Sequence, residues 1–89
     1  MLILDLGKHA AKFFKKLPPK HAAQVMRKIF DLQEFPYPQD SKLLKGFSYS
    51  RVDSGEYRIV YIVKPPMLVV RLIGKRNDDE VYRKLKRME

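Results

Sequence analysis

An arginine and a tyrosine lie six residues apart where a strand-like run gives way to a helix-like one. The segment 74–82 reads Gly-Lys-Arg-Asn-Asp-Asp-Glu-Val-Tyr and contains Arg76 and Tyr82. Arginine is a permanent cation whose planar fork matches phosphate oxygens, and a phenol can hydrogen-bond, stack on a base or take part in proton transfer. Because the chain carries a formal charge of +9, this pairing indicates phosphate chemistry or RNA contact.

A second arginine, Arg58, lies in the middle of an otherwise apolar strand-like run. A buried guanidinium costs several kcal/mol unless it is paired. In one interpretation Arg58 pairs with Asp53 or Glu56 across a hairpin. In the other it opens onto a concave sheet face beside Arg51, and with Arg76 the three guanidinium groups form a phosphate-binding arrangement.

Other kinds of chemical site are not indicated by the sequence. The two histidines, His9 and His21, lie on or beside basic helices with no cysteine, and we expect surface residues rather than metal ligands. The chain has no glycine-rich phosphate loop, nucleophile elbow or paired carboxylates. We therefore expect no metal or cofactor, and any catalysis must come from Arg, Lys and Tyr. Arg71 is expected to be an edge or surface contact.

Hydrophobic periodicity defines the elements that would position these residues. Two helices carry apolar stripes at helical spacing and meet at Pro18-Pro19, and we assign the aromatic and Met side chains of this region, Phe13, Phe14, Met26 and Phe30, to the core. Residues 34–45 contain two prolines and no period, which predicts a loop. Strands are expected at residues 2–6, 47–52, 57–63 and 67–73, with a turn at 53–56 and a final helix after Gly74.

The order β-α-α-β-β-β-α predicts a small α+β domain spanning residues 1–89: an antiparallel meander with two N-terminal helices packed on one face and a C-terminal helix. In the last helix, Asp78, Asp79 and Glu80 fall in the first turn, and basic residues follow, which complements the helix dipole. Its apolar stripe, formed by Val81, Leu85 and Met88, is narrow. We therefore expect this helix to be loosely docked and movable.

Composition favours a globular cytoplasmic protein with an anionic partner. The chain is 45% hydrophobic and 33% charged, has no cysteine, and has no apolar run near the roughly 20 residues that span a bilayer. A short apolar start with no preceding base does not resemble a signal peptide. Residues 6–30 contain seven bases and no acid. This clustering fits either a solvated surface or a polyanion-binding one.

Four short runs together resemble a known family: Lys42-Leu43-Leu44-Lys45-Gly46, Gly55-Glu56-Tyr57-Arg58-Ile59-Val60-Tyr61, Gly74-Lys75-Arg76 and Val81-Tyr82. The sequence resembles the RelE/ParE toxin superfamily of type II toxin–antitoxin modules, most closely its RelE branch. The likeness covers essentially the whole chain. It implies a metal-independent endonuclease that cuts mRNA in the ribosomal A site, by attack of a 2′-OH on the neighbouring phosphate.

The resemblance also implies residue roles. Arg58 and Arg76 would hold the phosphate, and Tyr82 would orient the attacking hydroxyl or stack on a base. Two lysine positions of RelE-like enzymes are occupied here by Tyr49 and Arg51. Arginine stabilises charge but is a poor proton shuttle, so either Tyr49 or Tyr82 transfers protons or the protein cuts slowly. Further RNA contacts are expected from Lys42, Lys45, Arg71 and Lys75.

The resemblance implies two partners, a cognate antitoxin and mRNA on the ribosome. Two other functions stay open: a ParE-like toxin that inhibits DNA gyrase without cutting RNA, and a plain basic nucleic-acid-binding module. The gyrase inhibitor would need neither Arg76 nor Tyr82. The binding module would show a steep salt dependence that survives loss of Tyr82.

Overall fold

Helices and strands follow the order expected from the sequence, with one added strand. The computed structural model describes residues 1–77 and 80–88. Within them the elements are β1 (Ile3–Leu6), α1 (Lys8–Lys15), α2 (Pro19–Glu34), β2 (Lys42–Leu43), β3 (Ser50–Ser54), β4 (Tyr57–Lys64), β5 (Met67–Lys75) and α3 (Glu80–Met88). The α+β fold class is confirmed. None of the described helices is long and apolar enough to cross a membrane.

The sheet is mostly antiparallel, in the order β1-β5-β4-β3-β2. The predicted meander is confirmed for β3, β4 and β5. β1, however, pairs in parallel with β5, with Ile3 opposite Met67. The added strand β2 pairs Lys42 with Arg51 inside the segment that we expected to be a loop. Two residues are too few to produce a recognisable alternation, which is why β2 was missed.

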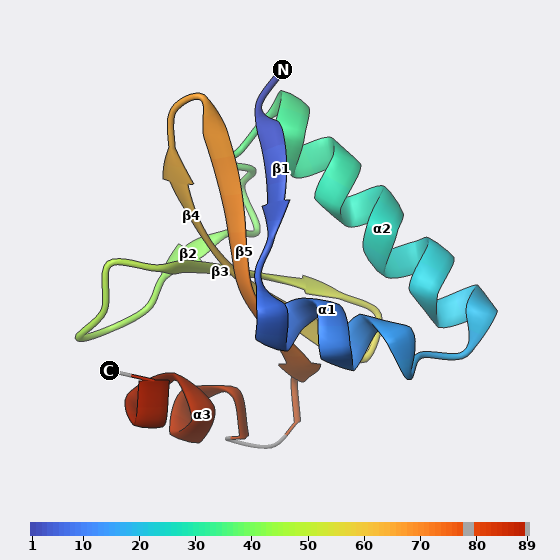
Figure 1. The fold of residues 1–89 in the computed structure, drawn as a ribbon. Helices are drawn as coiled ribbons and strands as arrows, with labels where there is room; N and C mark the ends of the chain where they lie inside the picture. Colours follow the sequence, from blue (N-terminus) through green and yellow to red (C-terminus); the bar gives the residue numbers. More distant parts are fainter. Residues whose placement is uncertain (78–79, 89) are drawn as a thin grey trace.

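Two helices cover one face of the sheet, as predicted. In Figure 1, α2 runs along the side of the sheet and α1 lies against β5. The stripe of α2 formed by Val25, Ile29 and Leu32 is fully buried against inward-facing residues of the sheet. The assignment of Phe30 to the core is wrong, because its side chain is 53% exposed. It follows Ile29 by one residue and therefore points about 100° away from the buried stripe.

The last helix packs against the opposite face of the sheet. Val81 and Leu85 are buried in a second cluster with Leu44, Val60 and Leu72. The stripe is as narrow as expected, because Val81 and Leu85 are buried and Met88 is only half-buried. That α3 is loosely docked and movable stays a prediction. Figure 1 shows α3 below the end of β5. The expectation for the two aspartates before Glu80 concerns residues outside the described ones.

Gly74 allows this close approach of α3 to the sheet. A Cβ atom at Gly74 would lie 2.6 Å from Cγ2 of Val81, far inside van der Waals contact. Valine has one strongly preferred rotamer in a helix, so its side chain cannot readily move away. Packing of α3 against β5 therefore requires a glycine at this position near the end of the strand.

We predict that Gly74→Ala destabilises the fold by about 1–3 kcal/mol, the usual cost of overpacking. Thermal unfolding followed by circular dichroism measures this effect. The matched control is the pair Val81→Ala and Gly74→Ala/Val81→Ala. If the clash is the cause, adding Gly74→Ala to Val81→Ala costs little. An equal loss in both backgrounds would contradict the steric explanation.

Candidate nucleic-acid cleft

The β3–β4 hairpin positions the central arginine. Its turn consists of Gly55 and Glu56, and Gly55 has a φ of +59°, a conformation that favours glycine. A Cβ at Gly55 would also lie 2.7 Å from Oε1 of Gln24 on α2. With the turn fixed in this way, the register places Asp53 directly opposite Arg58.

Alternation along the strands separates the two faces of the hairpin. Val52 and Ile59 belong to the core beneath α1 and α2. Asp53 and Arg58, each the next residue along its strand, therefore lie on the other face, the one that α3 packs against. Arg51 shares this face, because it is two residues from Asp53.

Arg58 is held by partners from a neighbouring strand and a helix. Its Nε donates to Oδ1 of Asp53 at 2.9 Å and its Nη2 donates to Oδ2 at 3.4 Å. Its Nη1 donates to the phenol oxygen of Tyr82 at 3.2 Å. The side chains of Arg58 and Asp53 are 15% and 32% exposed. Hydrogen bonding to Asp53 raises the pKa of the Arg58 guanidinium above its ordinary value, although burial acts in the opposite direction.

These contacts leave Arg58 with unused donors. A guanidinium has five N–H bonds in a fixed plane. Asp53 occupies the edge formed by Nε and Nη2, and Tyr82 takes one N–H of Nη1. One N–H on each terminal nitrogen is left for another acceptor. An anion can therefore bind to Arg58, but it must share the guanidinium with the Asp53 carboxylate.

Tyr82 reaches the sheet from the last helix, α3. Its neighbour Val81 is buried, and Tyr82 itself packs against the second core cluster. The guanidinium carbon of Arg58 lies 6.0 Å from the centre of the Tyr82 ring, within range of a cation–π contact. The structure thus brings together two of the expected site residues, Arg58 and Tyr82.

Arg51 and Tyr49 extend the site along β3. Arg51 is half-buried, faces Val60 on β4, and has exposed Lys42 as its partner on β2. Tyr49 precedes β3, and its half-buried ring packs with the second core cluster. The described contacts include no hydrogen bond or ion pair for the side chain of either residue. Both therefore lie beside the Arg58 pair without a fixed partner.

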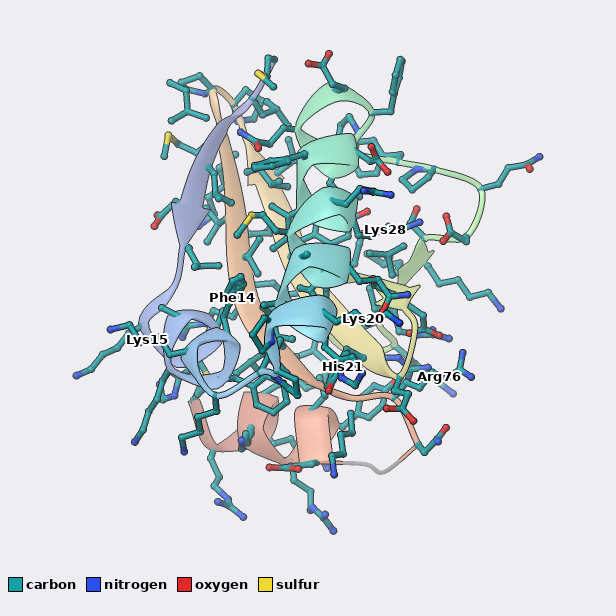
Figure 2. The ribbon with its side chains drawn as sticks, turned by 90° about the vertical axis from the view of Figure 1, so that its right-hand side faces the viewer. Phe14, Lys15, Lys20, His21, Lys28 and Arg76 are labelled. Atoms are coloured by element: carbon teal, nitrogen blue, oxygen red, sulfur yellow. The ribbon has the colours of Figure 1, made fainter. Side chains whose placement is uncertain are left out.

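The remaining cations lie farther from this pair. Arg76 follows β5, and its backbone N–H donates to the carbonyl of Glu56 at 3.0 Å, which places it beside the hairpin turn. Its exposed side chain has no hydrogen bond to Arg58 or Tyr82 among the described contacts, and Figure 2 shows it at the end of the sheet. Lys75 and Lys45 are exposed. Convergence of Arg76 with Arg58 stays a prediction.

Of the two positions expected for Arg71, an edge contact or a surface contact, the order of the strands contradicts the first. β5 lies between β1 and β4, and Arg71 is at the register shift where Val60 pairs with Leu72 and Tyr61 with Val70. The residue is half-buried, and its Nε has no hydrogen-bond partner among the described residues. A role for Arg71 in RNA contact is untested.

His21 is more than the surface residue expected from the sequence. Its Nδ1 is hydrogen-bonded to the phenol oxygen of Tyr57 at 2.7 Å, and the two rings meet edge to face. The sequence does contain a signal that His21 faces the sheet. His21 precedes Val25 by four residues and so continues the buried stripe of α2. The described residues contain no cluster of three or more potential metal ligands.

Arg51, Arg58 and Tyr82 together define the candidate cleft, a group of two cations and a phenol on the face of the sheet that α3 packs against. No protein-family model and no curated protein sequence matches the chain significantly. Solved structures do match. The isolated E. coli RelE toxin shares 27% identity, with both chains covered completely, and gives a TM-score of 0.75.

Two further structures agree with this match. A mutant of E. coli RelE in the free state shares 27% identity over 99% of this chain and 98% of that one, with a TM-score of 0.81. The RelBE2 toxin–antitoxin complex of Mycobacterium tuberculosis shares 24% identity over 84% of this chain and 98% of that chain, with a TM-score of 0.74. In fold and along its whole length, the chain is therefore similar to RelE toxins, which supports the resemblance to the RelE-like toxin superfamily found in the sequence.

Because Asp53 shares Arg58 with any bound anion, we predict that Asp53→Asn tightens binding of a single-stranded 2′-O-methyl RNA about fivefold, or about 1 kcal/mol. The same change lowers stability modestly, because a charge-assisted hydrogen bond is lost. Fluorescence anisotropy and thermal unfolding measure the two effects. Glu56→Gln removes the same charge from the exposed turn and is the matched control. Weaker RNA binding by Asp53→Asn would mean that Asp53 orients Arg58 instead of competing for it.

Proposed function

We propose that this chain is the toxin of a type II toxin–antitoxin module and acts as a ribosome-dependent, metal-independent mRNA endonuclease in the cytoplasm. The observation that carries the proposal is the hydrogen-bonded pair of Arg58 and Tyr82. It lies on one face of a sheet whose fold matches isolated RelE along the whole chain. Both residues stand at positions that the sequence resemblance implied.

The proposed reaction is an internal transfer at phosphorus. The 2′-oxygen of the RNA attacks the adjacent phosphate, the bond from phosphorus to the 5′-oxygen breaks, and a 2′,3′-cyclic phosphate and a free 5′-OH result. A base must take the 2′ proton and an acid must supply one to the leaving oxygen. Cations must stabilise the charge that builds up on the phosphate oxygens.

The cleft offers a group for each task. Arg58 presents its remaining N–H donors to the phosphate while Asp53 and Tyr82 fix its plane. Arg51, on the same face, adds positive charge to the transition state, and Arg76 supplies a further clamp from the end of the sheet. Proton transfer falls to Tyr82 or Tyr49, since arginine remains protonated. Bound on the ribosome, the mRNA would be oriented by its surroundings, which reduces what the protein must contribute.

An antitoxin is the proposed protein partner. Structural neighbours include RelBE complexes from E. coli and M. tuberculosis, in which a RelE toxin is bound by its antitoxin. A chain with a net charge of +9 favours association with an acidic partner, because opposite charges steer encounter and hold register.

We predict that Arg58→Ala and Tyr82→Phe each lower mRNA cleavage by at least about 100-fold, the scale of losing a transition-state donor or a proton-transfer group. Arg76→Ala should also weaken cleavage. Induced expression in a sensitive host, with primer extension on a reporter mRNA, measures growth arrest and new 5′ ends together.

Tyr37→Phe and Arg27→Ala are the matched controls, since both positions are exposed and lie outside the cleft. They should leave cleavage unchanged. Growth arrest without new 5′ ends, unaffected by the cleft variants, would instead support inhibition of gyrase. Absence of arrest together with salt-sensitive RNA binding would support a plain nucleic-acid-binding module.

We also predict that the product of a neighbouring gene, if it is the antitoxin, binds this chain with a dissociation constant below about 1 μM, as a stable complex of this kind requires. Isothermal titration calorimetry measures this affinity, and co-expression should restore growth. A neighbouring product that gives no binding heat and no rescue would contradict the toxin–antitoxin assignment.

A further inference from the structure

A basic groove separates α1 from α3. Two adjoining hollows of about 240 and 200 Å³ lie there and share His9 and Lys84 in their walls. Their linings contain four Lys or Arg side chains: Lys12 from α1, Lys16 directly after α1, and Lys84 and Arg87 from α3. We call this region the α1–α3 groove.

The floor of the groove is formed by buried residues of the sheet. Leu72 and Ile73 of β5 line its deeper hollow and are almost fully buried. Lys84 lies with its ammonium 6.0 Å from the centre of the Phe13 ring on α1, and it also forms an ion pair with Glu80 at 2.9 Å. Lys84 therefore bridges the two helices, and the other cations line the groove around it.

The charged residues that line the groove are all positive. Lys12 in the last turn of α1 and Lys16, its C-cap residue, are exposed and four residues apart, so they lie on the same side of the helix end. Arg87 is exposed on α3. None of the described residues lining the two hollows is acidic. Like charges gathered in this way repel each other, and an external polyanion would relieve that repulsion.

The groove is distinct from the cleft. Tyr82 points from α3 to Arg58, whereas Lys84 reaches Phe13 on α1. We propose that the α1–α3 groove is a second binding site for the phosphate backbone of RNA, used while the cleft holds the reacting phosphate. This inference deepens the proposed nuclease function and rests on it for the identity of the ligand.

RNA fits the groove better than an acidic protein does. Protein interfaces are centred on exposed aromatic or aliphatic anchors. The large hydrophobic side chains that are exposed in the described residues all lie outside α1 and α3: Met1, Ile3, Phe30, Phe35, Tyr37 and Leu43. A site lined by four Lys or Arg side chains, and by none of these exposed hydrophobic residues, suits a phosphate backbone.

The test replaces Lys12, Lys16 and Arg87 together with Gln. Lys84 is kept, because its contacts with Glu80 and Phe13 contribute to packing. The matched control replaces three exposed cations outside the groove, Lys15, Lys20 and Arg27, and so removes the same charge. Gln has a helix propensity close to that of Lys and Arg. Circular dichroism and thermal unfolding confirm that both triple variants fold.

The measurement is fluorescence anisotropy with a 20-nucleotide single-stranded 2′-O-methyl RNA, titrated over a range of salt concentrations. In the groove variant we expect at least a tenfold weaker affinity at physiological salt. The slope of log K against log salt should fall by about 2, since each lost phosphate contact on a single strand contributes about 0.7. The control variant should change affinity less than threefold and the slope by less than about 1.

Three results would overturn the proposal. Equal losses in both variants would mean that RNA senses only net charge, and unchanged binding in the groove variant would remove the site. A groove variant that loses affinity for a poly-glutamate peptide but not for RNA would assign the groove to an acidic protein. Cleavage on ribosomes is assayed separately. Wild-type protein that binds RNA through the groove yet cuts no mRNA would contradict the nuclease proposal and leave the groove standing.

Discussion

The candidate site depends on the need of a half-buried guanidinium for partners. The guanidinium of Arg58 is partly buried near the start of the central strand, β4, and an unpaired charge there would destabilise the sheet. Its two partners come from different parts of the chain, Asp53 across the hairpin and Tyr82 from α3. The turn at Gly55 sets the register that brings Asp53 opposite, and the burial of Val81 beside Gly74 sets the position of Tyr82. One electrostatic requirement thus joins the hairpin, the sheet and the last helix.

Periodicity was enough to predict most of the scaffold, because the burial of apolar stripes dictates it. The strands around Arg58, the helical stripe of α2 and the break at Pro18-Pro19 all follow from local patterns. The parallel pairing of β1 does not, since alternation shows that a segment is a strand but not which neighbour it joins. The exposure of Phe30 shows that local patterns are also incomplete for a helix. A hydrophobic residue beside an apolar stripe can point away from the core, and its hydrophobicity alone does not reveal this.

Prediction of the site was partial for a related reason. Sequence reasoning weighed a pair of Arg58 with Asp53 or Glu56 as one of two alternatives, and the register of the hairpin places Asp53 opposite Arg58. It could not give the hydrogen bond from Arg58 to Tyr82, which needs the packing of α3. It also overlooked the contact of His21 with Tyr57, where a polar residue continues an apolar stripe. Side chains that meet across elements distant in sequence are set by tertiary packing, and a single chain carries no direct record of them.

Tyr57 and Arg58 are consecutive residues that project to opposite faces of the sheet. One is fixed by His21 of α2, and the other by Asp53 of β3. The guanidinium is therefore anchored through the body of the domain, whereas the phenol of Tyr82 belongs to a helix that follows the last strand. Any event that lifts α3 from the sheet would remove the phenol and leave Arg58 in place with its Asp53 partner. Under the proposed nuclease function, such an event would stop the reaction while Arg58 still held the phosphate, so occupancy and turnover would be separately controllable properties.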